Sequence, residues 1–414
     1  MAHALFHLLL ALAAVVVLGR LLGSLFGMLR QPPVIGEVLA GIALGPSLLG
    51  RIAPDAYSYL LPSSTAPHLN AVAQVGVALY MFLVGLELNL DRLRTRARMT
   101  VAISNAGIIV PFVLGVILAF YLHPRLSTAA VPFRSFALFI GVAMSITAFP
   151  VLARILADRR IAESELGIVA LTCAAVDDVT AWCLLALVVG VARARVHSAL
   201  SAAFLTLGFI AIVLLAVRPV VARLASRARA TPTTIALTIT LACAVLSALT
   251  TEWIGIHAIF GAFLFGAIVP HDSGLARTLT GAPKTLVTVF LLPAFFAFAG
   301  MRTRIDLMST ASDWLTCALI ILVATVGKFG GCCAAARAMG MRLRQAAGLG
   351  ILMNTRGLME LIVLNIGLDL GVISPTLFTM MVLMALATTM ATTPLLDLLA
   401  VRLGRDGCPR SGQP

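Results

Sequence analysis

Residues 171–182 read LTCAAVDDVTAW, an apolar run with two adjacent carboxylates, Asp177 and Asp178, at its centre. The run lies inside the apolar segment 164–191, which is long enough to cross a membrane as a helix. A charged side chain at the centre of a bilayer costs at least about 2.5 kcal/mol, so acids placed there indicate a functional site. The stretch therefore predicts a membrane helix that carries chemistry.

The composition of the whole chain agrees with a membrane protein. Of its 414 residues 60% are hydrophobic and 11% are charged, and the mean hydropathy is +1.04. Soluble domains are about 25% charged, which excludes a cytosolic enzyme, a disordered chain and a disulfide-rich secreted domain. The net charge of +13 could suggest a nucleic-acid partner. We expect none, because the basic residues occupy short gaps between apolar runs.

The apolar runs predict an all-α polytopic membrane protein with about thirteen spans. The first run has no cleavage site and is interpreted as a retained helix. The gaps are too short for a soluble domain, so we expect a membrane domain over 1–400 and a short cytoplasmic tail over 401–414. The predicted spans are 4–22, 33–50, 69–88, 99–121, 134–156, 164–191, 198–217, 232–250, 253–270, 284–301, 312–333, 345–368 and 373–397.

Basic residues alternate between the gaps. One alternating set of gaps, together with the tail, holds 21 basic residues and the other set holds 7, while Lys328 and Arg356 lie inside spans. Because basic residues favour the cytoplasmic side, this bias predicts an outside N-terminus and a cytoplasmic C-terminus.

A weak internal repeat links the two halves of the chain. Gly85 ends the third span and Gly300 ends the tenth, and each precedes an aspartate by six residues. Glycine pairs also recur in the second and ninth spans, at Gly41 and Gly45 and at Gly261 and Gly266. An offset of seven spans inverts the second copy, and inverted repeats are typical of secondary transporters. Chance similarity between glycine-rich helices is the alternative.

Asp177 and Asp178 point about 100° apart on a helix, so their two carboxylates cannot both face the same partner. Two buried carboxylates repel each other, which favours the binding of a proton or a cation to one of them. The proton and the cation can then compete for that carboxylate. The alternative is a pair of salt-bridged residues that hold helices together. Lys328 is one of only two lysines in the chain. Lysine can lose its proton when it is buried, whereas arginine cannot. Lys328 is therefore a candidate proton-carrying partner or, alternatively, a snorkelling lysine.

Two spans are interrupted by poor helix formers. The fifth contains Thr147 and Pro150, and the twelfth contains Asn354, Arg356 and Glu360 in the run NTRGLME. Interrupted helices at corresponding places in two halves indicate a binding site. Arg356 and Glu360, four residues apart, can neutralise the exposed helix ends, and Thr147 can offer oxygen to a cation. A structural ion pair and an ordinary proline kink are the alternatives.

Glu37 begins a glycine-rich stretch in the second span and is interpreted as lining an access funnel or facing the headgroups. No nucleotide-binding motif is present, so we expect no cofactor and no nucleotide-binding domain in this chain. Transport is then driven by an ion gradient or is passive.

Several motifs together resemble monovalent cation:proton antiporter family 2 over nearly the whole chain. They are QPPVIGE at 31–37, FLVGLE at 82–87, Asp177-Asp178, Gly327-Lys328 and NTRGLMEL at 354–361. The last motif is especially similar to plant CHX cation/proton exchangers. The resemblance implies a sodium/proton-antiporter fold in which the discontinuous helices 5 and 12 cross. It also implies a homodimer, with scaffold helices 1–3 and 8–10 over 4–88 and 232–301. The core helices 4–6 and 11–13 would cover 99–191 and 312–397.

The resemblance also implies roles for residues. Asp178 would bind the cation, Na⁺ or K⁺, while Asp177 would pair with Lys328. The double aspartate resembles electrogenic, sodium-handling members, whereas the twelfth helix resembles potassium-handling ones, and the two signals conflict.

We therefore predict an antiporter, not an enzyme, in a bacterial inner membrane, which exchanges Na⁺ or K⁺ for H⁺ by alternating access. A monovalent cation channel is the alternative, but it needs a continuous pore and usually a repeated filter loop. A transporter of organic anions would need cationic groups without the acid pair.

Overall fold

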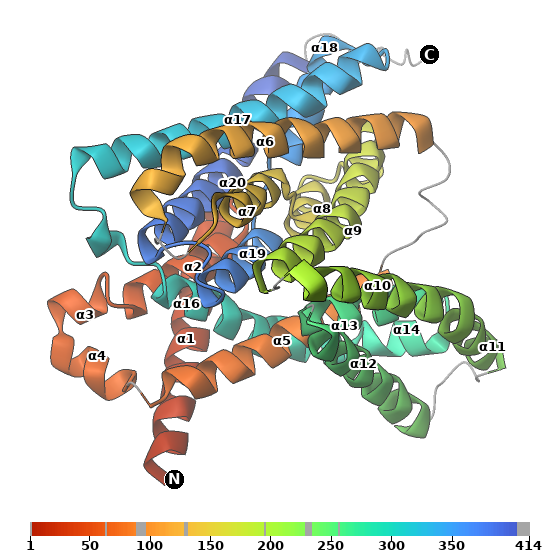
Figure 1. Cartoon of the computed structure of the whole chain (residues 1–414), viewed down its shortest axis with the longest axis horizontal. Coiled ribbons are helices and arrows are strands. Elements are labelled where there is room, and N and C mark those ends of the chain that lie inside the picture. The colour runs from red at the N-terminus through yellow and green to blue at the C-terminus, as the bar shows by residue number, and fades with distance from the viewer. Residues whose placement is uncertain are drawn as a thin grey trace, which may run out of the picture. The chain divides into compact units, whose positions relative to one another are not determined.

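The structure, a computed structural model, describes residues 2–62, 64–87, 97–127, 131–193, 196–227, 234–255 and 257–403. Within these ranges the chain forms helices and no strand (Figure 1). Eleven of its helical segments are long and apolar enough to cross a membrane, or twelve if one bent pair counts as a span. The chain is an all-α polytopic membrane protein, as predicted. From residue 404 onward the predicted tail lies outside the described residues.

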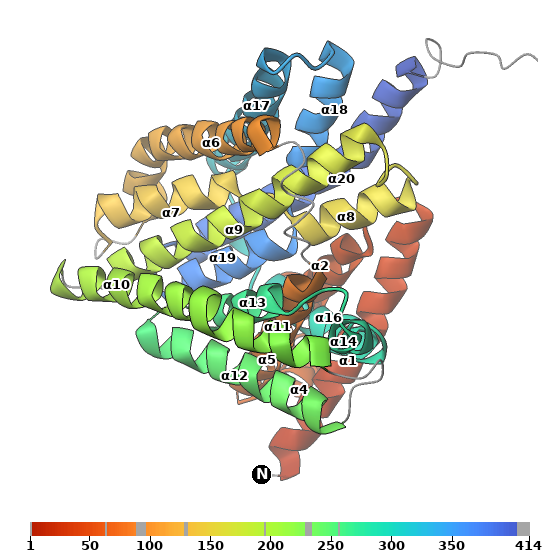
Figure 2. The ribbon, with the colours of Figure 1, turned by 90° about the vertical axis from the view of Figure 1, so that its right-hand side faces the viewer.

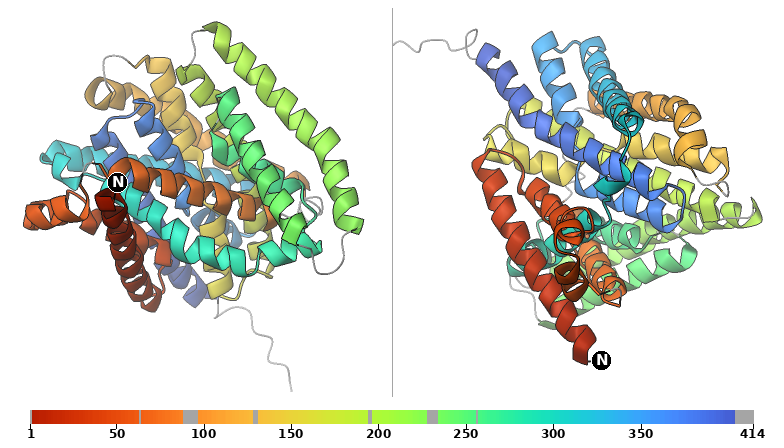
Figure 3. Two further views of the ribbon diagram at one scale, coloured as in Figure 1. Left: turned by 90° about the horizontal axis from the view of Figure 1, so that it is seen from below. Right: turned by 90° about the vertical axis from the view of Figure 1, so that its left-hand side faces the viewer.

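Contacts divide the chain into two compact units, which are described separately. The first comprises Met1–Leu25, Gly36–Arg94 and Trp182–Asp306. The π-helical turns η2 (Val213–Val217) and η3 (Val287–Leu291) join α10 to α11 and α15 to α16. Figure 3 shows α10 and α12 side by side. The helices that lie wholly or mainly in this unit are α1 (Ala2–Met28), α2 (Pro33–Leu44), α3 (Leu49–Ile52), α4 (Pro54–Leu60), α5 (Ala66–Glu87), α10 (Val196–Ile212), α11 (Arg218–Arg227), α12 (Thr234–Ile254), α13 (Ala258–Ile268), α14 (Gly274–Leu279), α15 (Ala282–Leu286) and α16 (Leu292–Met301).

The second unit comprises Phe26–Ile35, Thr95–Ala181 and Leu307–Pro414. Its long helices α6 and α17 run side by side in Figures 1 and 3, while α7 and α8 are separate helices in Figure 2. Its helices are α6 (Ala97–Leu126), α7 (Phe133–Ser145), α8 (Phe149–Asp158), α9 (Glu165–Arg193) as far as Ala181, α17 (Ala311–Ala338), α18 (Leu343–Met353), α19 (Leu358–Asp369) and α20 (Pro375–Leu403).

The ninth predicted span, 253–270, is shorter than we expected. Gly255 adopts a φ of 96° directly after α12, a left-handed conformation that ends helices and favours glycine. The helix that follows, α13, has only 11 residues. The predicted start of this span, at residue 253, was wrong. The helix end is set by the backbone conformation of Gly255, which an apolar sequence pattern does not show.

Glycines set the closest helix contacts in the first unit. A Cβ added to Gly85 on α5 would lie 2.3 Å from the carbonyl oxygen of Phe263 on α13. A Cβ added to Gly300 on α16 would lie 2.3 Å from the carbonyl oxygen of Val38 on α2. Helix α5 therefore packs against α13, and α16 against α2. If a repeat relates α2 to α13 and α5 to α16, the contact between α5 and α13 must recur as a contact between α16 and α2. Both contacts are present.

We expect Gly41→Ala to destabilise the protein by about 1–3 kcal/mol, the usual cost of overpacking. The added Cβ would lie 2.2 Å from the backbone oxygen of Ala297, which no side-chain rotation can relieve. Gly208→Ala is the control, since its Cβ meets nothing within 4 Å. Thermal melting of the purified proteins in detergent measures the difference. Equal melting temperatures for Gly41→Ala and Gly208→Ala would contradict the close contact between Gly41 and the backbone of Ala297.

Candidate functional site

Two interrupted helices meet in the second unit. Helix α7 ends at Ser145 and α8 begins at Phe149, while α18 ends at Met353 and α19 begins at Leu358. The backbone N–H of Ala148 in the first break donates to the carbonyl of Thr355 in the second, at 3.0 Å. The two breaks are therefore hydrogen-bonded to each other, and four helix ends surround them.

Pro150 lies in the first turn of α8, not inside a continuous helix. Proline is tolerated there because its missing N–H would have no intrahelical partner. Pro150 therefore starts the second half of the broken span and is not an ordinary kink.

Asp177 is completely buried and accepts three hydrogen bonds. Its Oδ1 accepts from the Ser104 hydroxyl at 2.5 Å. Its Oδ2 accepts from the Thr147 hydroxyl at 2.8 Å and from Lys328 Nζ at 2.9 Å. Helix α6, helix α17 and the first break each contribute one donor to this carboxylate, which belongs to α9. Both of its oxygens are thus occupied by donors.

Lys328 is 0% exposed, so it does not snorkel toward a membrane surface. Besides Asp177, its Nζ donates to the carbonyl oxygens of Gly107 at 2.8 Å and Ser145 at 2.5 Å. An ammonium has three protons, and all three are used here. Asp177 and Lys328 therefore form a fully hydrogen-bonded buried ion pair.

Asp178 differs from its neighbour. It is 2% exposed, and its Oδ1 has no hydrogen-bond partner among the described residues. The backbone N–H of Phe149, at the start of α8, faces its carboxylate. A buried carboxylate with an unpartnered oxygen is costly unless a proton or a cation binds to it. Asp178 therefore has the coordination capacity that Asp177 lacks.

Thr147 lies in the first break and is 0% exposed. Its hydroxyl points to Asp177 and also lies 3.2 Å from the carbonyl of Met353. The structure thus places Thr147 with the ion pair, and its predicted role toward a cation stays a prediction.

Arg356 and Glu360 form a buried ion pair on the second broken helix. Arg356 Nη1 lies 2.8 Å from Glu360 Oε2 and also donates to the carbonyl of Ala143 at 2.9 Å. Arg356 Nη2 donates to the carbonyl of Met144 at 2.6 Å. These carbonyls belong to the last turn of α7, where the helix dipole is negative. Arg356 therefore caps the first half of the other broken helix.

Asn354 follows the last residue of α18, and its buried Oδ1 has no partner among the described residues. Glu37 belongs to α2 in the first unit and is 7% exposed, with Gly19 beside it. It is not part of the unit that holds the two aspartates, and its funnel role stays a prediction.

Sequence reasoning missed two residues of this site, Ser104 and Thr389. Thr389 on α20 accepts from the N–H of Arg356 at 3.0 Å and donates to the carbonyl of Arg356 at 2.6 Å. Buried hydroxyls at 388, 389, 392 and 393 recur on α20, and this run was visible in the sequence. Hydroxyls are common in membrane helices, so the run alone did not identify a partner.

We expect Thr389→Val to destabilise the protein by about 2–3 kcal/mol, because it leaves a buried N–H and a buried carbonyl unpaired. Thr388→Val is the matched control, since that hydroxyl bonds only to carbonyls of its own helix. The two variants are compared by thermal melting in detergent. Equal losses would show that Thr389 does not hold the second break in place.

A helical membrane bundle in which two interrupted helices meet beside buried charges is the architecture of secondary ion transporters. A family model described as sodium/hydrogen exchanger, transmembrane, matches residues 11–398. The chain belongs to this family of transporters, as its motifs predicted.

Individual proteins resemble the chain over nearly its whole length. The Na⁺/H⁺ antiporter NhaS4 of Synechocystis is 46% identical over 94% of this chain and 96% of its own length. Cation/H⁺ antiporter 20 of Arabidopsis thaliana is 40% identical over 92% of this chain, which spans about half of that protein (47%). The solved structure of the sodium proton antiporter MjNhaP1 from Methanocaldococcus jannaschii has a TM-score of 0.68 at 16% identity. It covers 97% of this chain and 99% of its own, and this likeness shows the fold.

Proposed function

We propose that the chain is a secondary active antiporter that exchanges a monovalent cation, Na⁺ or K⁺, for H⁺. The observation that carries the proposal is the asymmetry of the two aspartates. Asp177 is occupied by Ser104, Thr147 and Lys328, whereas Asp178 keeps an unpartnered buried oxygen. One proton or one cation can neutralise Asp178, so the two compete for it. The similarity to proteins named as cation/proton antiporters supports this function.

Alternating access follows from the same competition. A cation that binds Asp178 displaces its proton, and a proton that binds displaces the cation. Either ligand neutralises the carboxylate, and a neutral site costs much less free energy to move within the membrane than a charged one. Lys328 pairs with Asp177, and Arg356 and Glu360 stabilise the crossing of the broken helices. The hydroxyl of Thr147 would complete the cation's oxygen ligands when it rotates away from Asp177.

The proposal extends to the assembly. The first unit would serve as the scaffold of a homodimer, and the second unit, which holds both aspartates, would be the mobile core. The proposed membrane is a bacterial inner membrane, and the bias of basic residues supports an outside N-terminus and a cytoplasmic C-terminus in it.

Competition predicts a specific pH dependence. While Asp178 is mostly protonated, each tenfold rise in proton concentration is expected to raise the apparent KM for the cation about tenfold. The maximal rate at saturating cation should change much less. Cation-dependent proton flux in proteoliposomes, measured over three pH units, tests this expectation. A cation flux whose KM does not change with pH would favour the channel alternative.

A further inference from the structure

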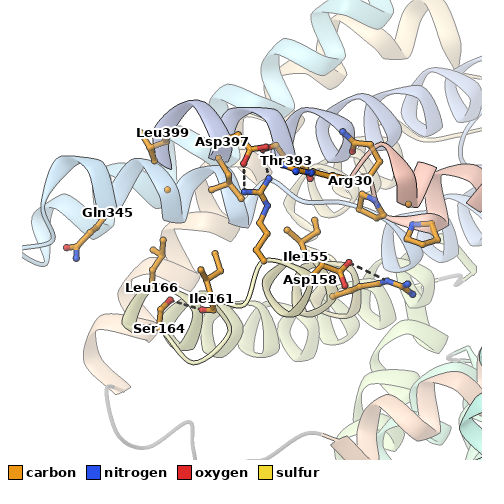
Figure 4. Close-up of a pocket in the computed structure, with 18 of the residues that line it drawn as sticks. Arg30, Ile155, Asp158, Ile161, Ser164, Leu166, Gln345, Thr393, Asp397 and Leu399 are labelled. Atoms are coloured by element: carbon orange, nitrogen blue, oxygen red, sulfur yellow. Dashed lines mark hydrogen bonds and ion pairs between the residues drawn. The ribbon is translucent and has the colours of Figure 1, made fainter. Parts of the chain in front are cut away.

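A cavity of about 860 Å³ opens within the second unit, away from the two aspartates (Figure 4). Its walls are the end of α8, the start of α18, the end of α20 and the residues between α1 and α2. The alternation of basic residues predicts that these segments lie on the cytoplasmic side. None of the residues assigned to the exchange site lines this cavity.

The lining carries an excess of positive charge. Four arginines line it against two aspartates: Arg30, Arg154, Arg159, Arg344, Asp158 and Asp397. Arg159 Nη1 pairs with Asp397 Oδ1 at 2.8 Å, an ion pair that Figure 4 marks with a dashed line at the labelled Asp397. The distance from Arg154 Nε to Asp158 Oδ2 is 3.8 Å, which is too long for a good hydrogen bond, and both side chains are more than half exposed. Arg154 therefore retains donors for a ligand.

Two helices end beside the cavity on arginines whose backbone conformation usually favours glycine. Helices α17 and α19 end on Gly340 and Gly371 with positive φ, and the following N–H bonds back to the last turn. Helices α1 and α8 end in the same way, but on Arg30 with a φ of 58° and Arg160 with a φ of 57°. These are the only non-glycine residues with positive φ in the described part of the chain.

Arginine is a strained choice at such a position. A non-glycine residue there costs about 1–2 kcal/mol, while a cation at a helix C-terminus returns only about 0.3–1 kcal/mol. Arg30 lines the cavity, and Arg160 lies in sequence between two residues that line it, Arg159 and Ile161. Within the described residues, strained arginines therefore occur only beside this cavity, which indicates that positive charge is required there.

We propose that the cavity binds a phosphate group, carried by an anionic phospholipid or by a soluble phosphate compound. The planar guanidinium of arginine binds phosphate with two parallel hydrogen bonds. Anionic lipids concentrate in the cytoplasmic leaflet, and basic pockets between membrane helices accept their headgroups. Leu166, Leu396 and Leu399 add an apolar wall that suits an acyl chain. The net positive charge disfavours a cation at the same place.

Calorimetric titration of the purified full chain in detergent tests the proposal. The probes are dioctanoyl phosphatidic acid, glycerol 3-phosphate, inorganic phosphate and dioctanoyl phosphatidylcholine as the zwitterionic control. We expect saturable binding of phosphatidic acid, at least tenfold tighter than of phosphatidylcholine. Glycerol 3-phosphate that binds as tightly as phosphatidic acid identifies a soluble phosphate as the ligand, and much weaker binding identifies the lipid.

The variant Arg154→Gln with Arg344→Gln is expected to weaken binding about tenfold or more, since charged hydrogen bonds are lost. Arg342→Gln is the matched control, because Arg342 is exposed, two residues from Arg344, and outside the lining. Its affinity should stay within about twofold of the wild type, because an exposed charge outside the site contributes little. No saturable binding of any phosphate by the wild type, or equal losses in both variants, overturns the proposal. The assay measures binding alone, so its outcome is independent of the exchange activity.

Discussion

The Asp178→Asn variant is expected to lose cation-coupled proton movement almost completely. An amide cannot release a proton in the physiological range and cannot neutralise a cation. At the effective dielectric constant of about 20 that describes charges in proteins, a single charge–charge contact of 4 Å is worth about 4 kcal/mol, which is roughly a thousandfold in affinity. The side chain is otherwise of the same shape, and Asp178 makes no side-chain ion pair among the described residues. The protein should therefore fold and remain inactive.

The matched control is Glu165→Gln, which removes an exposed carboxylate from the first turn of the same helix. This variant should retain antiport within about twofold, because an exposed charge is screened by solvent. Flux assays in proteoliposomes, with melting temperatures measured in parallel, separate lost activity from lost folding. Wild-type exchange by a folded Asp178→Asn protein would exclude Asp178 as the ion site.

The Lys328→Met variant is expected to lose about 3–5 kcal/mol of folding stability, since it leaves the buried Asp177 charge unpaired. The three acceptors of Lys328 Nζ lose their common donor, two of them backbone carbonyls. Adding Asp177→Asn removes the stranded charge, so the double variant should be more stable than Lys328→Met alone. Neither protein should exchange ions normally.

The chain supplies a matched control for this experiment. Lys284, the other lysine, pairs with Glu87, and both side chains are 38% exposed. Lys284→Met should therefore cost at most about 1 kcal/mol, the usual value of a surface ion pair. Thermal melting in detergent ranks the three variants against the wild type. A Lys328→Met protein as stable as Lys284→Met would show that the buried pair is not formed.

The sequence predicted the helical membrane fold, both interrupted helices and the family. Apolar length and basic-residue alternation carry that information directly, because a bilayer imposes both. The break that contains Thr147 and precedes Pro150, and the break that begins at Asn354, were both visible as runs of poor helix formers. The end of the eighth span was predicted at residue 250, whereas α12 continues to Ile254 and ends before Gly255, whose positive φ leaves no trace in hydropathy.

The difference between Asp177 and Asp178 could not be obtained from residue spacing. Spacing shows only that adjacent residues diverge, and it was the family resemblance that assigned Lys328 to Asp177. The structure adds the hydroxyl of Ser104, which comes from a helix more than seventy residues away in the sequence. Such a contact depends on tertiary packing. The same holds for Thr389, which clamps the backbone of Arg356 from the last helix.

The most direct test of coupled exchange is the lumenal pH of proteoliposomes that are loaded with Na⁺ or K⁺ and diluted into cation-free buffer. A permeant anion prevents a lasting membrane potential, and the lumenal and external pH start equal. The account predicts that the outward cation gradient drives protons inward, so the lumen acidifies with wild-type protein and not with Asp178→Asn. Cation loss from the wild-type vesicles without any change in lumenal pH would contradict antiport.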